Sequence, residues 1–451
     1  MIIEMRRAMK LRDCIILLSI ILLTGCQGFP TLSTSKPNEA PSYELPTITP
    51  KYDKETISDF KKKAGMGKTN RYEGLVVSND PILSLPDTLP ASLTYNTGID
   101  IPYPNNGVRG LYISDAMLMD PEYMDYILEY VRDTELNTVV IDFKTDYGHI
   151  ANQEESDNPV INEHRLNIDM RKILERLEEY QIYPIARIVT FKDNLTADAS
   201  PDLSFFDKEE GAVWADPNGS KYLNPFLQST WDYILEIAEE AAKLGFKDIQ
   251  FDYVRFPEGF FEVEPMLEYN IGDFSIERDE TGQSTGYERV EAINHFLEYA
   301  KKRLTLYDVQ VSADIFGYTA IAGDKYDVRG IGQNFAQMAE RLDTVSSMIY
   351  PSHWDAGFLG FDYPDLYPYE FVDAYIKEEQ HVFDTSVKNE VNTRPWLQDF
   401  TWYKEPGTFL EYGPAEVEAQ IQALADNGIY EFLLWNASGE YQHGVDYYKG
   451  P

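Results

Sequence analysis

Cysteine and histidine, the side chains that most often bind zinc, are both scarce in this chain of 451 residues. Its two cysteines, Cys14 and Cys26, lie near the start, so no disulfide can link the segments that follow. The six histidines form no His-x-His or His-Glu-x-x-His pattern: they are His149, His164, His295, His353, His381 and His443. A zinc-dependent hydrolase therefore lacks its usual ligands, and we expect no cofactor. A divalent cation bound by aspartates is the less favoured alternative.

Basic side chains are also under-represented, with 39 Lys and Arg against 76 Asp and Glu, which gives a formal net charge of −37. This charge would repel nucleic-acid phosphates and anionic lipids, so we expect no nucleic-acid partner, and neutral or cationic partners fit better. The alternative is that the acidity only keeps the protein soluble. The sequence contains neither the Gly-x-x-x-x-Gly-Lys-Ser/Thr loop of nucleotide-binding proteins nor the Gly-x-Ser-x-Gly turn of serine hydrolases.

The apolar run over residues 15–23 is too short to span a membrane as a mature helix. Basic residues precede it: they are Arg6, Arg7, Lys10 and Arg12. The run ends in Leu23-Thr-Gly-Cys26, which resembles the lipobox of bacterial lipoproteins. This layout predicts a signal peptide over residues 1–25 and a lipid on Cys26, which would hold the protein outside the cytoplasm on a membrane. An uncleaved anchor, the alternative, would also leave the domain outside the membrane.

Residues 26–104 are rich in Pro, Ser and Thr, which is typical of an extended, semi-rigid tether. Its first half carries closely spaced prolines: they are Pro30, Pro37, Pro41, Pro46 and Pro50. We therefore expect a tether and N-terminal extension, followed by one folded domain over residues 105–451.

From residue 108 onward, strand-like and helix-like segments alternate, which favours βα units and a parallel sheet. Eight segments have strand patterns: 108–114, 138–144, 183–191, 248–256, 309–316, 344–350, 394–401 and 430–436. Amphipathic helix patterns lie between them: 121–135, 168–180, 228–244, 287–304, 368–379 and 414–427. This count predicts an α/β fold, a (β/α)8 barrel. Few residues follow Asn436, so we expect the eighth helix to be short or missing, and part of the N-terminal extension could cover the gap.

Three of the expected strands carry an aspartate among alternating apolar side chains, namely Asp142, Asp252 and Asp314. In a barrel the apolar side chains would face the helices, so these aspartates would project inward near the top. Long connections follow the third, fourth and sixth strands on the side where barrel enzymes build their active sites: they are residues 192–226, 257–286 and 351–367. Their aromatic residues would either stack on sugar rings or pack the loops onto the barrel: they include Trp214, Tyr222, Phe260, Phe261, Trp354 and Phe361.

Carboxylates that share a buried pocket have their pKa values driven apart, so that one stays protonated and another stays ionised. Glycosidic bond cleavage needs such a pair. Asp252 and Asp314 lie on neighbouring expected strands, and a strand spacing of about 4.8 Å suits the carboxyl separation of about 5 to 5.5 Å in retaining enzymes. We expect retention. Arg255 would hold the Asp252 carboxylate ionised and oriented, or else form a structural ion pair.

Polar and aromatic residues near the ends of several strands complete the expected bowl. The candidate substrate-binding residues are Asp142, Lys144, Tyr253, Arg255, Tyr350, His353, Trp354, Gln398, Asp399, Trp435 and Asn436. We expect them to contact a polysaccharide or oligosaccharide.

Six segments of the chain resemble a family of bacterial glycosyl hydrolase barrel domains that is distantly related to alpha-amylase-type glycosidases. They are Gly107-Val-Arg-Gly-Leu-Tyr112, Val140-Ile-Asp-Phe-Lys144, Gly245-Phe-Lys-Asp-Ile-Gln-Phe-Asp-Tyr-Val-Arg-Phe-Pro257, Ser312-Ala-Asp-Ile-Phe-Gly317, Met348-Ile-Tyr-Pro-Ser-His-Trp354 and Arg394-Pro-Trp-Leu-Gln-Asp-Phe400. The resemblance implies a TIM barrel and carbohydrate hydrolysis. It also implies that the strand-four carboxylate, Asp252, is the nucleophile and that the strand-five carboxylate, Asp314, is the acid/base, where amylase-type enzymes usually carry Glu.

Two other functions compete with a glycoside hydrolase. One is a non-catalytic glycan-binding or envelope-scaffolding lipoprotein that uses a hydrolase fold. The other, less favoured, is a deacetylase or lyase that acts on the same glycans.

Overall fold

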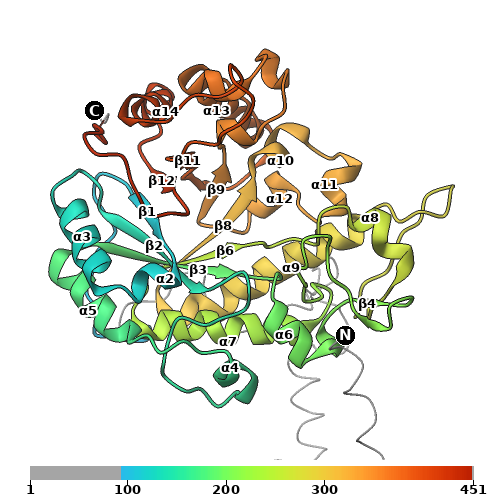
Figure 1. Ribbon diagram of the computed structural model, residues 1–451. Coiled ribbons are helices and arrows are strands. Elements are labelled where there is room, and N and C mark those ends of the chain that lie inside the picture. Colours follow the sequence, from blue (N-terminus) through green and yellow to red (C-terminus); the bar gives the residue numbers. More distant parts are fainter. Residues whose placement is uncertain (1–92, 449–451) are drawn as a thin grey trace, which may run out of the picture. The chain divides into compact units, whose positions relative to one another are not determined.

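A computed structural model describes residues 93–448, and eight parallel strands form a closed barrel at the centre of this part of the chain (Figure 1). The strands are β1 (Arg109–Ile113), β2 (Thr138–Lys144), β3 (Tyr183–Val189), β6 (Asp248–Asp252), β8 (Gln310–Phe316), β9 (Thr344–Met348), β11 (Trp396–Gln398) and β12 (Phe432–Trp435). Their order around the barrel is β9-β11-β12-β1-β2-β3-β6-β8, and β8 pairs with β9 to close it. The predicted (β/α)8 barrel is confirmed. The expected signal peptide, Cys26 and most of the expected tether lie outside the described residues.

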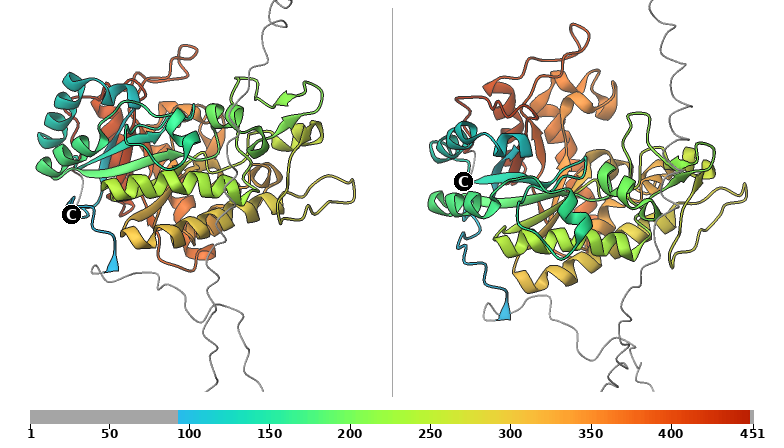
Figure 2. Two further views of the ribbon diagram at one scale, coloured as in Figure 1. Left: turned by 90° about the horizontal axis from the view of Figure 1, so that it is seen from below. Right: turned by 60° about the horizontal axis from the view of Figure 1, so that its bottom comes forward.

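Helices surround the strands, and six of them fall where the sequence predicted. These are α3 (Pro121–Arg132), α5 (Met170–Tyr180), α7 (Gln228–Leu244), α9 (Tyr287–Leu304), α13 (Pro368–Ser386) and α14 (Pro414–Asp426). Local signals fix their ends: the Asp120 side chain caps α3 ahead of Pro121, and Gly245 ends α7 with a φ of 121°. Figure 2 shows α7 and α9 side by side along the outside of the barrel.

Shorter elements fill the connections. The short helices are α2 (Asp115–Leu118), α4 (Pro159–Glu163), α6 (Asn194–Ala199), α8 (Phe260–Val263), α10 (Gly317–Ala322), α11 (Tyr326–Gly330) and α12 (Phe335–Ala339). Single 3-10 turns are η2 (Pro201–Leu203), η3 (Glu264–Met266), η4 (Thr305–Tyr307), η5 (Pro351–His353), η6 (Phe358–Gly360) and η7 (Pro364–Leu366). Within residues 93–448, no helix has the length and apolar character needed to cross a membrane.

Side chains of β6 alternate between the helices and the barrel interior, as the sequence pattern predicted. Phe251 points outward, where its ring centroid lies 5.2 Å from that of Phe296 on α9. Gln250 points inward and donates from Nε2 to the Ser346 hydroxyl of β9 over 3.2 Å. Asp252 ends the strand on the same inward side, so the pleat of β6 delivers its carboxylate to the mouth of the barrel.

The opposite end of the barrel, where the strands begin, is closed. Lys247, which precedes β6, donates from Nζ to the Ile99 carbonyl over 2.7 Å, and Ile99 is buried. The ring of Tyr103 lies edge-on to that of Tyr183, the first residue of β3, at 5.3 Å. The segment just before β1 therefore covers this end, and the pocket opens on the other one.

No helix follows β12 in the described residues, as expected, and the gap is filled by the C-terminal segment. Tyr441 donates its hydroxyl to the Tyr112 carbonyl over 2.6 Å. Tyr447 is 1% exposed, stacks on Phe432 of β12 and shares a 2.7 Å hydrogen bond with the Tyr130 hydroxyl of α3. Aromatic side chains thus cover the strands where the eighth helix would lie.

Two of the long connections build a small sheet together. The strands β4 (Phe206–Asp207) and β5 (Ala212–Val213) follow β3, whereas β7 (Leu267–Glu268) follows β6, and their order is β5-β4-β7. The remaining strand, β10 (Asn392–Thr393), pairs with β9 just before β11 begins. The small sheet ties the loops after β3 and β6 to one another beside the barrel mouth.

Candidate active site

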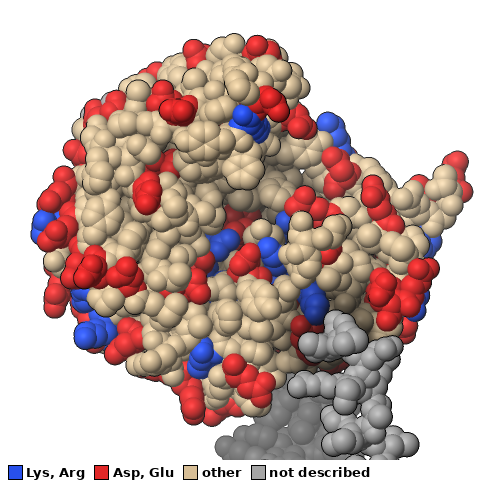
Figure 3. Space-filling view, in the orientation of Figure 1, with Lys and Arg blue, Asp and Glu red and all other residues tan. Residues whose placement is uncertain are grey.

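A cavity of about 580 Å³ opens at the carboxyl ends of the strands, which is within the usual size range of small-molecule sites (Figure 3). Acidic and basic side chains both reach this hollow. Its walls are formed by Arg187, Asp252, Tyr253, Arg255, Glu258, Asp314, Phe316, Gly317, Tyr318, Gln333, Met348, Tyr350, His353, Trp354, Asp355, Phe358, Trp396 and Trp435. The main candidates therefore lie on one face of the domain.

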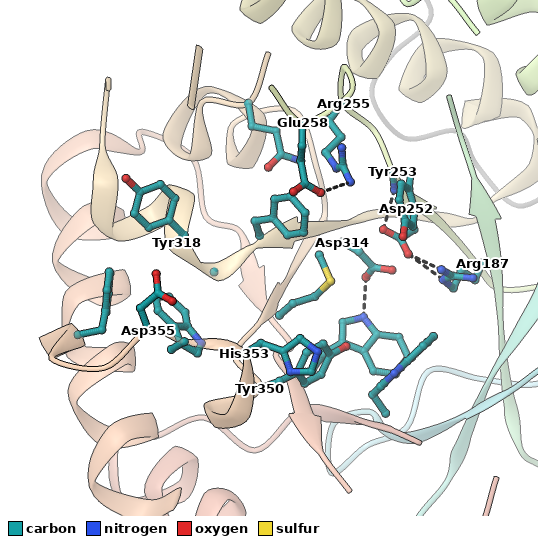
Figure 4. A pocket seen from close by; sticks show the side chains of 18 residues that line it. Arg187, Asp252, Tyr253, Arg255, Glu258, Asp314, Tyr318, Tyr350, His353 and Asp355 are labelled. Carbon is teal, nitrogen blue, oxygen red and sulfur yellow. Dashed lines mark hydrogen bonds and ion pairs between the residues drawn. The ribbon is translucent and has the colours of Figure 1, made fainter. Parts of the chain in front are cut away.

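Asp252 and Asp314 both line this cavity and come from adjacent strands (Figure 4). Phe251 of β6 pairs with Ala313 of β8, and each aspartate is the next residue on its strand. Asp252 Oδ1 accepts from its neighbouring Tyr253 amide over 2.6 Å. The register of two paired strands therefore brings the two carboxyl groups to the same level.

Arg187 of β3 supplies the counter-charge for Asp252. Its Nε and Nη2 both donate to Asp252 Oδ2, over 2.9 Å and 2.5 Å. Its Nη1 donates to Oδ1 of Asp142 on β2, whose Oδ2 accepts from the Tyr112 hydroxyl of β1. One guanidinium thus links aspartates of two strands, and all three charged side chains are buried.

The surroundings of Asp314 are different, because no cation among residues 93–448 forms an ion pair with it. Its Oδ1 accepts from the indole Nε1 of Trp396 on β11 over 2.7 Å, and the residue is 2% exposed. Burial, with the negative charge of Asp252 as the second cause, raises the pKa of Asp314 well above its usual range. Burial also raises the pKa of Asp142, although Arg187 and Tyr112 oppose this.

The prediction that Arg255 holds the Asp252 carboxylate is wrong. The backbone turns sharply after β6, where Tyr253 has a φ of 48°, and this turn carries Arg255 away from Asp252. Arg255 instead donates from Nη1 to the Phe256 carbonyl and from Nη2 to Glu258 Oε1, over 3.1 Å and 2.9 Å. Arg255 still lines the cavity, so its predicted contact with substrate stays a prediction.

Sequence reasoning missed Arg187, although a signal was present. The strand reads Tyr183-Pro-Ile-Ala-Arg-Ile-Val189, in which a single charged residue lies among apolar ones. A cation in the middle of a buried strand needs a buried partner, because leaving it unpaired costs several kcal/mol. The inward-facing aspartates of the neighbouring strands were the available partners.

The other substrate-binding candidates divide into three groups. Five line the cavity as the prediction requires: they are Tyr253, Tyr350, His353, Trp354 and Trp435. Asp142 does not line the cavity, but it accepts a hydrogen bond from Arg187, which does. Four more are buried and bonded within the protein, away from the lining: they are Lys144, Gln398, Asp399 and Asn436.

The inward position that the alternation along β2 predicted for Lys144 is wrong, because the register with β3 shifts between Asp142 and Lys144, and Lys144 does not line the cavity. Its Nζ lies 2.9 Å from Asp193 Oδ2, both side chains are fully buried, and it also donates to the Val189 carbonyl over 2.8 Å. The loop after β3 supplies Asp193 as the partner of this ammonium group. Lys144 therefore forms a structural ion pair with Asp193 and does not contact the substrate.

Gln398, Asp399 and Asn436 hold loops. Gln398 Oε1 accepts from the Ser352 amide over 3.0 Å, which fixes the start of the loop after β9. Asn436 donates from Nδ2 to the carbonyls of Asp399 and Glu440. Asp399 accepts a long hydrogen bond of 3.4 Å, its Oδ1 has no partner among the described residues, and burial raises its pKa to about 7. Gln398 and Asn436 are therefore engaged inside the protein, whereas Asp399 is buried with one oxygen unpaired among the described residues.

Most of the loop aromatics pack the loops, as one of the two interpretations held. Trp214, Tyr222, Phe260 and Phe261 are all at most 8% exposed. Phe361 lies against Tyr367 and Phe371, with ring centroids 5.5 Å and 5.7 Å apart. Trp354 differs from them because it lines the cavity.

The sequence did not single out several further lining residues, namely Glu258, Phe316, Tyr318, Gln333, Met348, Asp355 and Phe358. Most belong to loops and short helices after β6, β8 and β9, whose paths the residue pattern does not fix. In residues 93–448, no three His, Cys, Asp or Glu side chains form a group that could hold a metal ion. The aspartates at the barrel mouth are instead engaged by Arg187 and Trp396.

The barrel and its carboxylate-lined mouth define a glycosyl-hydrolase-like domain. The family model described as "Putative glycosyl hydrolase domain" matches residues 110–441, and the chain belongs to this family. A comparison with curated proteins found no match.

Among three similar solved structures, that of PgaB (BpsB) supports the barrel fold. The glycoside hydrolase domain of PgaB (BpsB) from Bordetella bronchiseptica is 14% identical, with a TM-score of 0.51 over 74% of this chain and 95% of that one. A hypothetical protein from Ruminiclostridium thermocellum ATCC 27405 is 29% identical over 49% of this chain and 98% of that one, with a TM-score of 0.38. The glycoside hydrolase domain of PelA from Pseudomonas aeruginosa is 13% identical over 75% of this chain and 98% of that one, with a TM-score of 0.40.

Proposed function

We propose that the protein is a glycoside hydrolase that cleaves O-glycosidic bonds in a cell-envelope or extracellular polysaccharide, with Asp252 and Asp314 as its catalytic pair. One observation carries the proposal. Two carboxyl groups lie on adjacent strands in one cavity, and they have different hydrogen-bond partners. Asp252 contacts the Arg187 guanidinium, whereas Asp314 is buried with a neutral indole as its hydrogen-bond donor.

In the proposed mechanism Asp314 is the general acid. Its raised pKa favours the protonated carboxyl group, which can protonate the leaving glycosidic oxygen. The Asp252 carboxylate attacks the anomeric carbon as the bond to that oxygen breaks, and a glycosyl ester forms. Asp314, now ionised, takes a proton from a water molecule that displaces Asp252 and restores both groups. Arg187 orients Asp252 through two N–H bonds during both steps.

The same geometry supports retention. Adjacent strands lie about 4.8 Å apart, which suits the short carboxyl separation of about 5 to 5.5 Å in retaining enzymes. The family description and the mixed aromatic and polar lining of the cavity support a carbohydrate substrate.

Substitution of each aspartate tests the proposal. Purified wild-type, Asp252→Asn and Asp314→Asn proteins are incubated with cell-wall polysaccharides and exopolysaccharides, and new reducing ends are measured. We expect cleavage by the wild type and its loss in Asp252→Asn, while polysaccharide binding survives. An active Asp252→Asn protein would overturn the assignment of the nucleophile. Binding without any cleavage by the wild type would favour a glycan-binding protein instead.

We also propose that lipid on Cys26 anchors the protein to a membrane outside the cytoplasm. The sequence pattern ending at Cys26 supports this. Incorporation of labelled palmitate into the wild-type protein and its loss in Cys26→Ser are the expected results. Equal labelling of both proteins would exclude Cys26 as the modified residue.

A further inference from the structure

A second, smaller cavity of about 160 Å³ adjoins the catalytic one. Trp354 and Asp355 line both, so the two cavities share one wall. The second cavity lies over the loops after β9 and β11, and its lining is Trp354, Asp355, Ala356, Tyr363, Pro364, Asp365, Lys404 and Thr408. Space for a ligand therefore extends from the catalytic aspartates in one direction.

Large aromatic side chains are exposed on the two loops that line this second cavity, and Tyr363 is itself part of the lining. Trp402 is 50% exposed, Tyr403 is 73% exposed and Tyr363 is 40% exposed. The ring centroid of Trp402 lies 5.2 Å from that of His353, which lines the catalytic cavity. The aromatic surface therefore begins at the rim of the catalytic cavity and continues outward.

Hydrogen bonds hold the two loops that carry this surface. Lys404 donates from Nζ to the Ser352 carbonyl, which ties the loop after β11 to the loop after β9. The Ser352 amide donates to Gln398 Oε1, and the Tyr412 amide donates to Thr401 Oγ1 over 2.9 Å. These hydrogen bonds restrict the loops that carry the exposed rings, which lowers the entropic cost of binding a ligand.

We propose that Trp402, Tyr403 and Tyr363, with the second cavity, form a subsite for further sugar rings of the same glycan chain that occupies the catalytic cavity. The inference rests on the proposed function and deepens it, because it makes the substrate a chain of several sugars and not a simple monoglycoside. The chain runs from Asp252 and Asp314 past Trp354 and onto the loop after β11.

The chemistry of the surface suits a glycan. Aromatic faces pack against the C–H faces of sugar rings, and polar groups bind their hydroxyls. Polar side chains lie between the rings here, since Asp355, Lys404 and Thr408 line the same cavity. The Lys404 ammonium has three N–H donors, and Ser352 accepts one of its hydrogen bonds.

The subsite is tested with Trp402→Ala and Tyr403→Ala, neither of which alters the catalytic pair. The matched control is Tyr180→Ala, because Tyr180 is 38% exposed at the end of α5, just before β3 begins and thus on the other side of the barrel. The probes are the nitrophenyl monoglycosides, disaccharides and hexasaccharides of the chitin, cellulose and starch series, together with the polysaccharide that the wild type cleaves.

We expect kcat/KM on the long substrates to fall by about tenfold in Trp402→Ala, mainly through KM, since one aromatic contact is worth about 1 kcal/mol or more. Rates on the monoglycosides should not change, and Tyr180→Ala should match the wild type on all probes. Equal losses on short and long substrates, or no loss on either, would overturn the subsite.

Affinity measurements on a variant without catalytic activity can test this subsite independently of the proposed function. Affinities for the hexasaccharides and the polysaccharide are measured in the Asp252→Asn protein, with and without Trp402→Ala. Weaker binding on loss of Trp402 supports the subsite even if the wild type proves inactive. Unchanged affinity overturns the subsite but leaves the catalytic pair intact. If no glycan binds, or if Trp402→Ala alters only association with another protein, the subsite is overturned.

Discussion

The indole Nε1 of Trp396 donates a hydrogen bond to Oδ1 of Asp314 over 2.7 Å. An indole N–H can only donate, so Oδ1 must accept, and the acidic proton of a neutral Asp314 lies on Oδ2. The charged and titratable groups that interact electrostatically with Asp314 come from several elements: Asp252 from β6, Arg187 from β3, Tyr350 after β9 and Arg394 before β11. Trp396 therefore decides which oxygen carries the proton that the proposed mechanism transfers.

Trp396→Phe should move the alkaline limb of the kcat/KM pH profile upward. The indole hydrogen bond stabilises the ionised form of Asp314, so its loss raises the pKa of Asp314 further. The protonated acid then persists to higher pH. Trp231→Phe is the matched control, because Trp231 is also buried but donates to the Pro225 carbonyl. Unchanged profiles in both variants would contradict this coupling.

Asp314→Asn should lose activity selectively on poor leaving groups. A dinitrophenolate needs no proton to leave, whereas a sugar alkoxide does, so formation of the glycosyl ester from a dinitrophenyl glycoside should survive. We expect a burst of dinitrophenol followed by slow turnover, and about a 100-fold or greater loss on the polysaccharide. Asp252→Asn should show no burst. Equal losses on both substrates in Asp314→Asn would argue against an acid/base residue here.

Arg187→Met should destabilise the domain strongly. It leaves Asp142 and Asp252 buried without their shared cation, which costs about 3–5 kcal/mol in the free energy of unfolding. Adding Asp142→Asn should recover part of this loss, because one of the two unpaired charges is removed. Denaturant unfolding of the single and double variants measures both effects. A double variant less stable than Arg187→Met would contradict the shared ion pair.

Because of Asp399, we expect the free energy of unfolding to decrease as the pH rises. Burial raises its pKa from 3.8 to about 7, so the folded state binds a proton that the unfolded state releases. The stabilising contribution is complete below about pH 4 and is lost between about pH 4 and 7. At pH 8, the free energy of unfolding of Asp399→Asn, measured in urea, should be higher than that of the wild type by on the order of 3 kcal/mol.

The exposed Asp202→Asn serves as the control for this pH dependence. Glu379, whose pKa burial also raises to about 7, should leave a residual slope in Asp399→Asn that Glu379→Gln removes. A wild type equally stable at pH 5 and pH 8 would contradict both assignments.

Much of the fold could be predicted because it depends on local patterns. The alternation along β6 put Asp252 inward, and the alternation along β8 did the same for Asp314. Helix ends followed local signals such as Asp120 ahead of Pro121. The segment between β8 and β9 shows the limit, since three short helices occupy it and no long amphipathic pattern marked them.

Side-chain contacts between different strands of the barrel could not be predicted. Arg187 meets Asp142, which is 45 residues away, and Asp252, which is 65 residues away, only because the strands are neighbours in the closed sheet. Arg255 was the nearer candidate in sequence, and the turn at Tyr253 directed it to Glu258 instead.

The sequence by itself determined the number of strands, the faces of their side chains and therefore the aspartates at the barrel mouth, because these follow from periods of two and 3.6 residues. Only the tertiary structure decided which partner each side chain has. The alternation along β2 predicted an inward Lys144, but the register with β3 shifts after Asp142, and Asp193 from the loop after β3 is the partner of the Lys144 ammonium group. Contacts of this kind depend on loop paths and barrel closure, and no local period encodes them.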